Sequence, residues 1–351
     1  MAQATIEPEP VIEPDLPIVD AHHHLWFVPE AARAGLDPAV SPYFHVRRRT
    51  PRYLFDELLA DLAAGHKVVA TVFVECHSMY RPDGPDGLRS VGEVEFVNGV
   101  AAMAASGAFG PAKACAGIVG NVNLTMGDEV EAILRAHLEA GGGRYRGVRH
   151  STQQDPDPAF RGVGGGNPPH QLLDPAFQRG FAWLERFGLS FDAFVFEPQL
   201  PDVIALAGAF QATPIVLNHA GTPLGFGGYA SRREERFPVW RENMRRLADH
   251  PNVMVKLGGL GMPVCGFPCF MADPPATSAQ LAQDWRPYVE AAIELFGAGR
   301  CMFESNFPTE SGAADYRTLW NAFKRLAAGC SADEKAELFS GVARRVYRLA
   351  D

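Results

Sequence analysis

Short apolar runs typical of buried strands alternate with helix-like segments along almost the whole 351-residue chain. Most of these runs are continuously apolar, as are the strands of a parallel sheet that helices cover on both faces. Eight such runs can be counted, at residues 17–26, 67–75, 114–123, 145–150, 189–195, 214–219, 252–257 and 300–306. Eight strands, each followed by a helix or a long loop, predict a single-domain α/β fold, the (β/α)8 TIM barrel.

A doubly wound open sheet is the alternative that the same alternation allows. It lacks support, because no Gly-x-Gly-x-x-Gly follows the first apolar run. The N-terminal residues 1–16 are acidic and rich in proline, so we expect them to form a disordered tail. Residues 17–351 would then be the barrel domain.

Local signals predict where two of the helices begin. Thr50 followed by Pro51 is typical of an N-cap and a first helical residue. Ser331 with Glu334 three residues on is a capping box, which predicts the start of a C-terminal helix.

Charge and composition exclude several classes of function. The net charge is −9, and Arg47, Arg48 and Arg49 are expected to be a solvated surface, so we expect no binding to nucleic acid. No apolar stretch approaches the ~18 to 20 residues that span a bilayer, and the acidic N-terminus differs from a secretory signal. The six scattered cysteines are typical of reduced, packed thiols. We therefore expect a cytoplasmic protein without membrane contact.

The first apolar run ends in three consecutive histidines, His22, His23 and His24. Residues in a strand alternate between its faces, so Asp20, His22 and His24 should point the same way. Two neutral imidazoles can bind a divalent metal, or they can hydrogen-bond directly to a substrate carbonyl or carboxylate. The pattern predicts a functional site at the end of this strand.

The other apolar runs also end in polar residues. In a barrel these ends meet at the carboxyl-terminal mouth, where catalytic groups lie. The polar ends include Glu75, Asn121, Arg149, Asp192, His219, Lys256, Glu304 and Asn306. One polar strand end can be structural, but a full set favours an active site.

Two loops should lie over the same mouth. Residues 261–284 are too long for a simple connector and follow the seventh strand, which predicts a lid. Residues 162–169, rich in glycine, form a second loop after the fourth strand. Both are expected to shape the choice of substrate, and a contact between subunits of a homo-oligomer is the alternative.

Six short motifs follow one another in chain order. They are Asp-Ala-His-His-His-Leu-Trp at 20–26, Gly-Val-Arg-His at 147–150, Leu-Ser-Phe-Asp at 189–192, Val-Leu-Asn-His-Ala-Gly at 216–221, Val-Lys-Leu-Gly-Gly-Leu at 255–260 and Met-Phe-Glu-Ser-Asn-Phe-Pro at 302–308. Together they resemble the amidohydrolase superfamily of the amidohydrolase-2 type, and within it the sugar-lactone and 2-pyrone-4,6-dicarboxylate lactonase branch. The resemblance runs from about residue 17 to the end of the chain.

The resemblance implies roles for individual residues. His22 and His24 match the metal-binding His-x-His pair, and His219 would be a third ligand or would orient the substrate. Arg149 would bind a carboxylate or hydroxyls of the substrate bidentately. Residues 191–194 lack the histidine that the family carries at strand five. One divalent ion, Zn or Mn, is therefore expected instead of two, and a metal-independent mechanism stays open.

At strand eight the family's catalytic Asp is matched by Asn306. An amide cannot take a proton from water at neutral pH. Glu304 lies two residues earlier, where related chains more often have Gly, and alternation puts it on the same face as Asn306. We therefore expect Glu304 to supply the missing carboxylate. Glu75 is the second candidate, and a structural pairing of Glu304 with Lys256 or an arginine is the alternative.

The leading hypothesis is a hydrolase that opens a small carboxylated or polyhydroxylated lactone. Metal-dependent decarboxylation of an aromatic or muconate-like acid is the second hypothesis, and it would need the strand-five histidine and the strand-eight acid that this chain lacks. A non-catalytic, ligand-binding barrel is the third. Asn306 favours it, whereas the retention of His22, His24, His219 and Arg149 argues against it.

Overall fold

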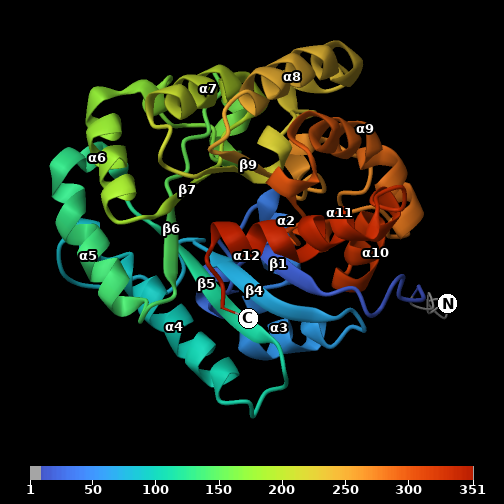
Figure 1. Cartoon of the computed structure of the whole chain (residues 1–351), viewed down its shortest axis with the longest axis horizontal. Helices are drawn as coiled ribbons and strands as arrows, with labels where there is room; N and C mark the ends of the chain where they lie inside the picture. Colours follow the sequence, from blue (N-terminus) through green and yellow to red (C-terminus); the bar gives the residue numbers. More distant parts are fainter. Residues whose placement is uncertain (1–8, 351) are drawn as a thin grey trace.

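Eight parallel strands form one sheet that curves into a barrel in this computed structural model, which describes residues 9–350 (Figure 1). Each strand pairs with the next one along the chain, in the order β1-β4-β5-β6-β7-β8-β9-β10. Their bounds are β1 (Ile18–His23), β4 (Val68–Val74), β5 (Lys113–Asn121), β6 (Tyr145–Arg149), β7 (Ser190–Ala193), β8 (Ile215–Leu217), β9 (Val253–Lys256) and β10 (Cys301–Met302). The predicted TIM barrel is confirmed.

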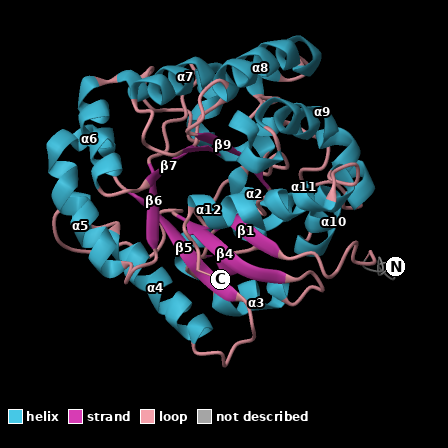
Figure 2. Ribbon diagram, in the orientation of Figure 1, coloured by secondary structure: helices cyan, strands magenta, loops and turns pink. Residues whose placement is uncertain are grey.

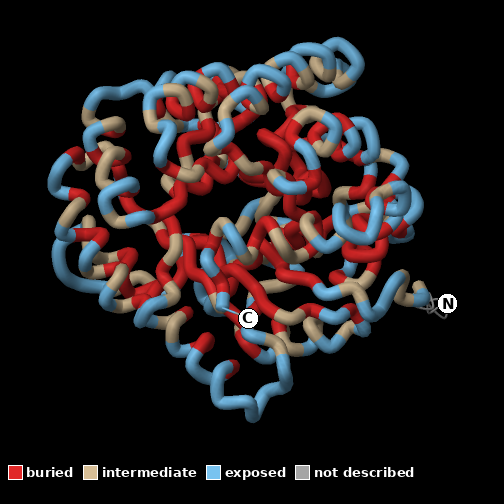
Figure 3. Tube along the Cα trace, viewed as in Figure 1, coloured by how far each residue is buried: buried red, intermediate tan, exposed pale blue. Residues whose placement is uncertain are grey.

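Helices surround the strands as an outer ring (Figure 2). The longer ones are α3 (Phe55–Leu62), α4 (Val91–Ala105), α5 (Val130–Ala140), α6 (Pro175–Arg186), α7 (Leu200–Ala209), α8 (Arg233–Ala248), α9 (Ser278–Phe296) and α10 (Tyr316–Leu326). Shorter elements are α1 (Glu30–Arg33), α2 (Tyr43–Arg49), α11 (Ala332–Ala336), α12 (Val342–Val346) and the small antiparallel pair β2 (Trp26–Phe27) and β3 (Arg52–Tyr53). Buried residues follow the strands and the inner sides of the helices (Figure 3).

The barrel closes just beyond the end of β10, beside β1. Asn306 donates its backbone N–H to the carbonyl oxygen of His22 at 2.8 Å. Ser305 donates both its N–H and its hydroxyl to the Asp20 carboxylate, at 2.9 and 2.6 Å. These bonds fix residues 304–306 next to the histidines of β1. The opposite part of the barrel interior is filled by apolar side chains of the strands and of α12.

The two predicted helix starts have different outcomes. Ser331 caps α11, and its hydroxyl and the Glu334 side chain form the capping box. Thr50 does not begin a helix, because it ends α2. The residues after it pair with β2 as β3, and the next helix begins only at Phe55. Strand pairing outweighs the local capping signal here.

Part of the expected disordered tail lies against the barrel. Residues 1–8 fall outside the described residues, but Ile12 donates its N–H to Asn321 Oδ1 at 2.9 Å. Lys324 donates to the carbonyl oxygen of Glu13 at 2.7 Å. Both partners lie on α10, so residues 9–16 are bound to this helix, contrary to the expectation.

All six cysteines are free thiols, as predicted. Within residues 9–350, no helix combines the length and the apolar character that a membrane span requires.

Candidate active site

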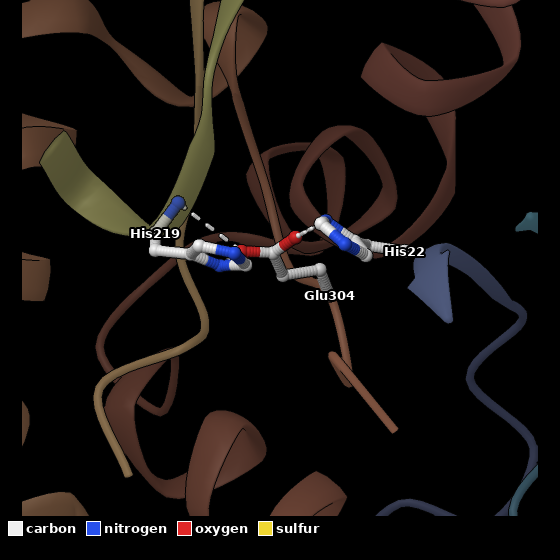
Figure 4. A group of neighbouring side chains, drawn as sticks. All are labelled: His22, His219 and Glu304. Atoms are coloured by element: carbon white, nitrogen blue, oxygen red, sulfur yellow. Dashed lines mark hydrogen bonds and ion pairs between the residues drawn. The ribbon is translucent and has the colours of Figure 1, made fainter. Parts of the chain in front are cut away.

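Glu304 lies just after β10, between two imidazole rings (Figure 4). Its Oε2 is 2.6 Å from His22 Nδ1, and its Oε1 is 2.7 Å from His219 Nδ1. All three side chains are at most 1% exposed. The alternative pairing of Glu304 with Lys256 is not formed, because Lys256 donates to Asp192 at 2.7 Å. The structure thus brings together three residues that the sequence placed on three different strand ends.

An irregularity in β1 and a close approach from β9 shape this cluster. The register of β1 shifts between Asp20 and His23. As a result, Asp20 points toward α10 and accepts a hydrogen bond from Tyr316 at 3.0 Å. Simple alternation predicted instead that Asp20 and His22 would point the same way. A Cβ on Gly259 would lie 2.2 Å from His219 Nδ1, so only glycine leaves room for that ring. His219 itself has a φ of 55°, a strained conformation often found at functional sites.

Hydrogen bonding assigns the protons of the two imidazoles. An ionised carboxylate only accepts, so His219 Nδ1, which is hydrogen-bonded to Glu304 Oε1, carries the hydrogen that faces this carboxylate. His22 Nδ1 lies just as close to Glu304 Oε2, but that contact does not have hydrogen-bond geometry. Burial, reinforced by the Lys256 cation, holds the pKa of His22 well below its ordinary value, so this ring is neutral. A guanidinium only donates, so His22 Nε2, which lies 3.3 Å from Arg149 Nη1, is an acceptor. His219 donates to Glu304 through Nδ1, so Nε2 is the accepting atom of this ring in its neutral form.

Glu75, after β4, is buried as deeply as Glu304 but has other partners. Arg149 donates its Nε–H to Glu75 Oε1 at 2.6 Å and an Nη2 hydrogen to the Glu75 carbonyl oxygen. Glu75 Oε2 is buried without a hydrogen-bond donor among the described residues, and His77 Nε2 lies 3.5 Å away. Glu75 thus takes two of the five N–H hydrogens of Arg149, and the substrate contact that we expected would use the remaining ones.

His24 lies beside the cluster and contacts Asn306. Its Nδ1–H donates to the Val74 carbonyl oxygen at 2.8 Å, so its Nε2 is an acceptor. In the structure this Nε2 lies 3.2 Å from Asn306 Oδ1, and Asn306 Nδ2 faces Glu310. Two acceptors cannot bond to each other, so we assign the amide in the flipped orientation, with its NH₂ group toward His24. The amide oxygen then faces Glu310. Burial raises the pKa of Glu310 to about 8, so this acid is protonated at neutral pH and can donate to that oxygen.

A cavity of about 370 Å³ opens over these groups, at the lower end of the range for small-molecule sites. Its polar floor consists of His24, Glu75, Arg149, His219 and Asn306. His22 and Glu304 do not line the cavity, but Glu304 is hydrogen-bonded to His219, which does. Of the predicted strand-end residues, His24, Glu75, Arg149, His219 and Asn306 therefore meet at one small chamber.

The family model for amidohydrolases matches residues 19–349. This chain belongs to the amidohydrolase family. It is 31% identical to the uncharacterized protein y4mH of Sinorhizobium fredii, over 95% of this chain and 99% of that protein. An L-fucono-1,5-lactonase of Burkholderia multivorans is 33% identical over 60% of this chain and 65% of its own length. A solved amidohydrolase of the same species with bound zinc is 27% identical, with a TM-score of 0.71 over 95% of this chain and 99% of that chain.

The donors of this amidohydrolase fit a divalent metal ion. One ligand atom from each of His22, His219 and Glu304 lies within 4.8 Å of the others. Nitrogen and carboxylate donors suit Zn²⁺ and Mn²⁺, and three protein ligands are typical of a catalytic zinc site. His24, which we expected as a ligand, is not part of this group. The group shares His22 and His219 with the ligands expected from the sequence and adds Glu304.

Sequence reasoning missed one wall of the amidohydrolase cavity. The segment around α2 contributes Ser41, Tyr43, Phe44, Val46 and Arg47 to the lining. Arg47 was expected on a solvated surface, but only its neighbours Arg48 and Arg49 are exposed. The aromatic residues next to the arginine run are the signal that could have indicated a binding segment. Both predicted mouth loops do reach the cavity, through residues 162–164 and through Met262.

Proposed function

We propose that this enzyme opens a lactone by adding water to the ring carbonyl at the floor of the cavity. The observation that carries the proposal is the Glu304 carboxylate bonded to His219, whose accepting Nε2 is turned away from Glu304 at the cavity floor. The partial relationship to an L-fucono-1,5-lactonase supports a cyclic ester as the reacting group.

His219 is the general base in this reaction. Its Nε2 takes a proton from the attacking water, and Glu304, 2.7 Å from Nδ1, stabilises the imidazolium that results. The water oxygen bonds to the carbonyl carbon. The ring C–O bond then breaks, and His219 returns its proton to the departing alkoxide, which gives a hydroxy acid.

Arg149 and Asn306 stabilise the negative charge on the carbonyl oxygen. Both line the floor, and the Asn306 NH₂ group has a second hydrogen beyond the one that faces His24. Glu75 keeps Arg149 in place through the bonds described above. In this arrangement Glu75 is a positioning residue, and Glu304 is the carboxylate that supports the base.

The same donors would hold one Zn²⁺ or Mn²⁺ through His22, His219 and Glu304. A bound ion would supply Lewis-acid polarisation of the lactone carbonyl or of water. A neutral imidazole has a single lone pair, so His219 cannot bind an ion and accept a proton at the same time. His219 is therefore either a metal ligand or the general base, and the effect of metal removal on activity distinguishes these two roles.

Metal-dependent decarboxylation has less support in the structure. Strand β7 supplies Asp192 where that reaction was expected to need a histidine, and Asp192 pairs with Lys256. Position 306 carries an amide instead of an acid.

The test is proton release in a weakly buffered indicator assay with aldonolactones, aromatic lactones and linear esters. We expect the wild type to hydrolyse at least one lactone and His219→Asn to lose this activity. His45→Asn, which changes an exposed histidine outside the cavity, is the matched control. No hydrolysis of any lactone, together with CO₂ release from an aromatic acid, would overturn the proposal.

A further inference from the structure

Above its polar floor, the cavity has a mainly apolar and aromatic wall. Trp26, Phe44, Val163, Phe194 and Met262 supply most of this wall. Its polar side chains are those of Ser41, Tyr43, Arg47, His77, Ser151, Gln153 and Thr309. A hydroxyl group that enters such a chamber without a hydrogen-bond partner loses its bonds to water and gains none. The wall therefore disfavours a substrate with a hydroxyl on every carbon.

The apolar wall is held in place by close packing between loops. A Cβ on Gly162 would lie 1.9 Å from the Val40 carbonyl oxygen, so the loop after β6 touches the segment that precedes α2. The ring of Phe160 in the same loop packs 5.2 Å from Phe196 and 5.6 Å from Phe226. These contacts build the chamber before any substrate binds.

One arginine of the wall has donors left for a ligand. The Arg47 guanidinium lies 4.9 Å from the centre of the Trp26 ring, and no carboxylate pairs with it in the part of the chain that the structure describes. Arg149 on the floor differs, because Glu75 occupies two of its donor groups. An unpaired guanidinium held against an aromatic ring is well suited to bind a carboxylate.

We propose that the enzyme prefers a lactone with an apolar, aromatic body and one carboxylate, and that Arg47 binds this carboxylate. The inference rests on the proposed lactone hydrolysis and goes further by naming the substrate class. The lactone carbonyl lies at His219, the body of the substrate packs between Trp26 and Val163, and the carboxylate reaches the rim at Arg47. Arg47 is thus a specificity-determining residue on a segment outside the strand ends.

Three five-membered lactones test the proposal: 5-carboxyphthalide, phthalide and galactono-γ-lactone. We expect kcat/KM to fall in this order. Arg47→Gln should lower kcat/KM for 5-carboxyphthalide by about 10- to 100-fold, mainly through KM, because a charge-assisted hydrogen bond is lost. The same variant should leave phthalide hydrolysis within about twofold of the wild type. Arg48→Gln, at the exposed neighbouring position, should leave kcat/KM for both phthalides unchanged.

Each contrary result has a distinct meaning. Faster hydrolysis of galactono-γ-lactone than of phthalide would overturn the apolar preference and leave lactone hydrolysis standing. An equal effect of Arg47→Gln on both phthalides would overturn the role of Arg47. If none of the three lactones is hydrolysed, the proposed function fails. Calorimetric titration with 5-carboxyphthalide then decides the inference on recognition: equal affinity of the wild type and Arg47→Gln overturns it, and a selective loss in the variant supports it.

Discussion

Two buried carboxylates at the barrel mouth have opposite kinds of partner. Glu304 lies between the rings of His22 and His219, whereas Glu75 is held by the guanidinium of Arg149. The charge of Glu75 is balanced by a permanent cation. The charge of Glu304 faces two imidazoles and can stabilise a proton that arrives on His219 during the reaction. The two carboxylates have the same residue type and similar burial, so their partners are what distinguishes them.

The largest expected effect comes from His219 and Glu304 together. His219→Asn should lower kcat by about 10²- to 10⁴-fold, the range for a lost general base. Because the two residues act as one unit, the double variant His219→Asn with Glu304→Gln should be little worse than His219→Asn alone. The measurement is steady-state kinetics on the best lactone, with the thermal midpoint as a check on folding. Fully additive losses would show that the two side chains act separately.

Glu75→Gln should have a smaller effect. The amide keeps one acceptor for Arg149 but loses the ion pair, so we expect kcat to fall by only about tenfold through a less well fixed Arg149. Arg149→Gln should cost more than Glu75→Gln, since it removes the oxyanion donor itself. A loss with Glu75→Gln that matches His219→Asn would identify Glu75 as the base instead.

Glu310 is a third buried acid, and no side chain among residues 9–350 forms an ion pair with it. Burial raises its pKa from 4.5 to about 8 in the folded protein. The folded state therefore binds its proton more tightly than the unfolded state, and the stability gained from this proton is lost as the pH rises from about 4.5 to 8. As the pH rises over this range, the thermal midpoint of Glu310→Gln should therefore increase relative to that of the wild type. Glu30→Gln, on the surface, is the control, and parallel pH curves for all three proteins would contradict the assignment.

The smallest expected effect is that of a chelator. If His219 works as a base, removal of metal by EDTA and dialysis should leave kcat within about twofold of its starting value. Metal content before and after treatment is measured by plasma mass spectrometry. Loss of activity that Zn²⁺ or Mn²⁺ restores would assign His22, His219 and Glu304 to ion binding and would remove His219 from the base role.

Strand-borne parts of the site were open to prediction from the sequence. The order of apolar runs predicts the barrel, and the polar residues at their ends predict Glu75, Arg149, His219 and Glu304 at one mouth. These inferences succeed because strand direction and closure fix where each carboxyl end lies. The close approach of Gly259 to His219 is a packing contact between strand ends and leaves no periodic trace in the sequence.

Parts built by loops and by irregular backbone were not predictable in the same way. The β1 irregularity separates Asp20 from His22, and no alternation pattern contains it. Arg47 lines the cavity because the segment around α2 folds back across the mouth. The run of three arginines resembles a solvated surface in the sequence, yet its first member is part of the cavity wall. The set of partners around Glu304 and Glu75 likewise depends on distances between strands that are remote in the chain.

The most direct test of the account compares Glu304→Gln with Glu75→Gln on the same lactone, after chelation and at matched thermal stability. We expect a kcat for Glu304→Gln at least about tenfold below that of Glu75→Gln. A Glu304→Gln enzyme within about threefold of the wild type, with Glu75→Gln inactive, would contradict it.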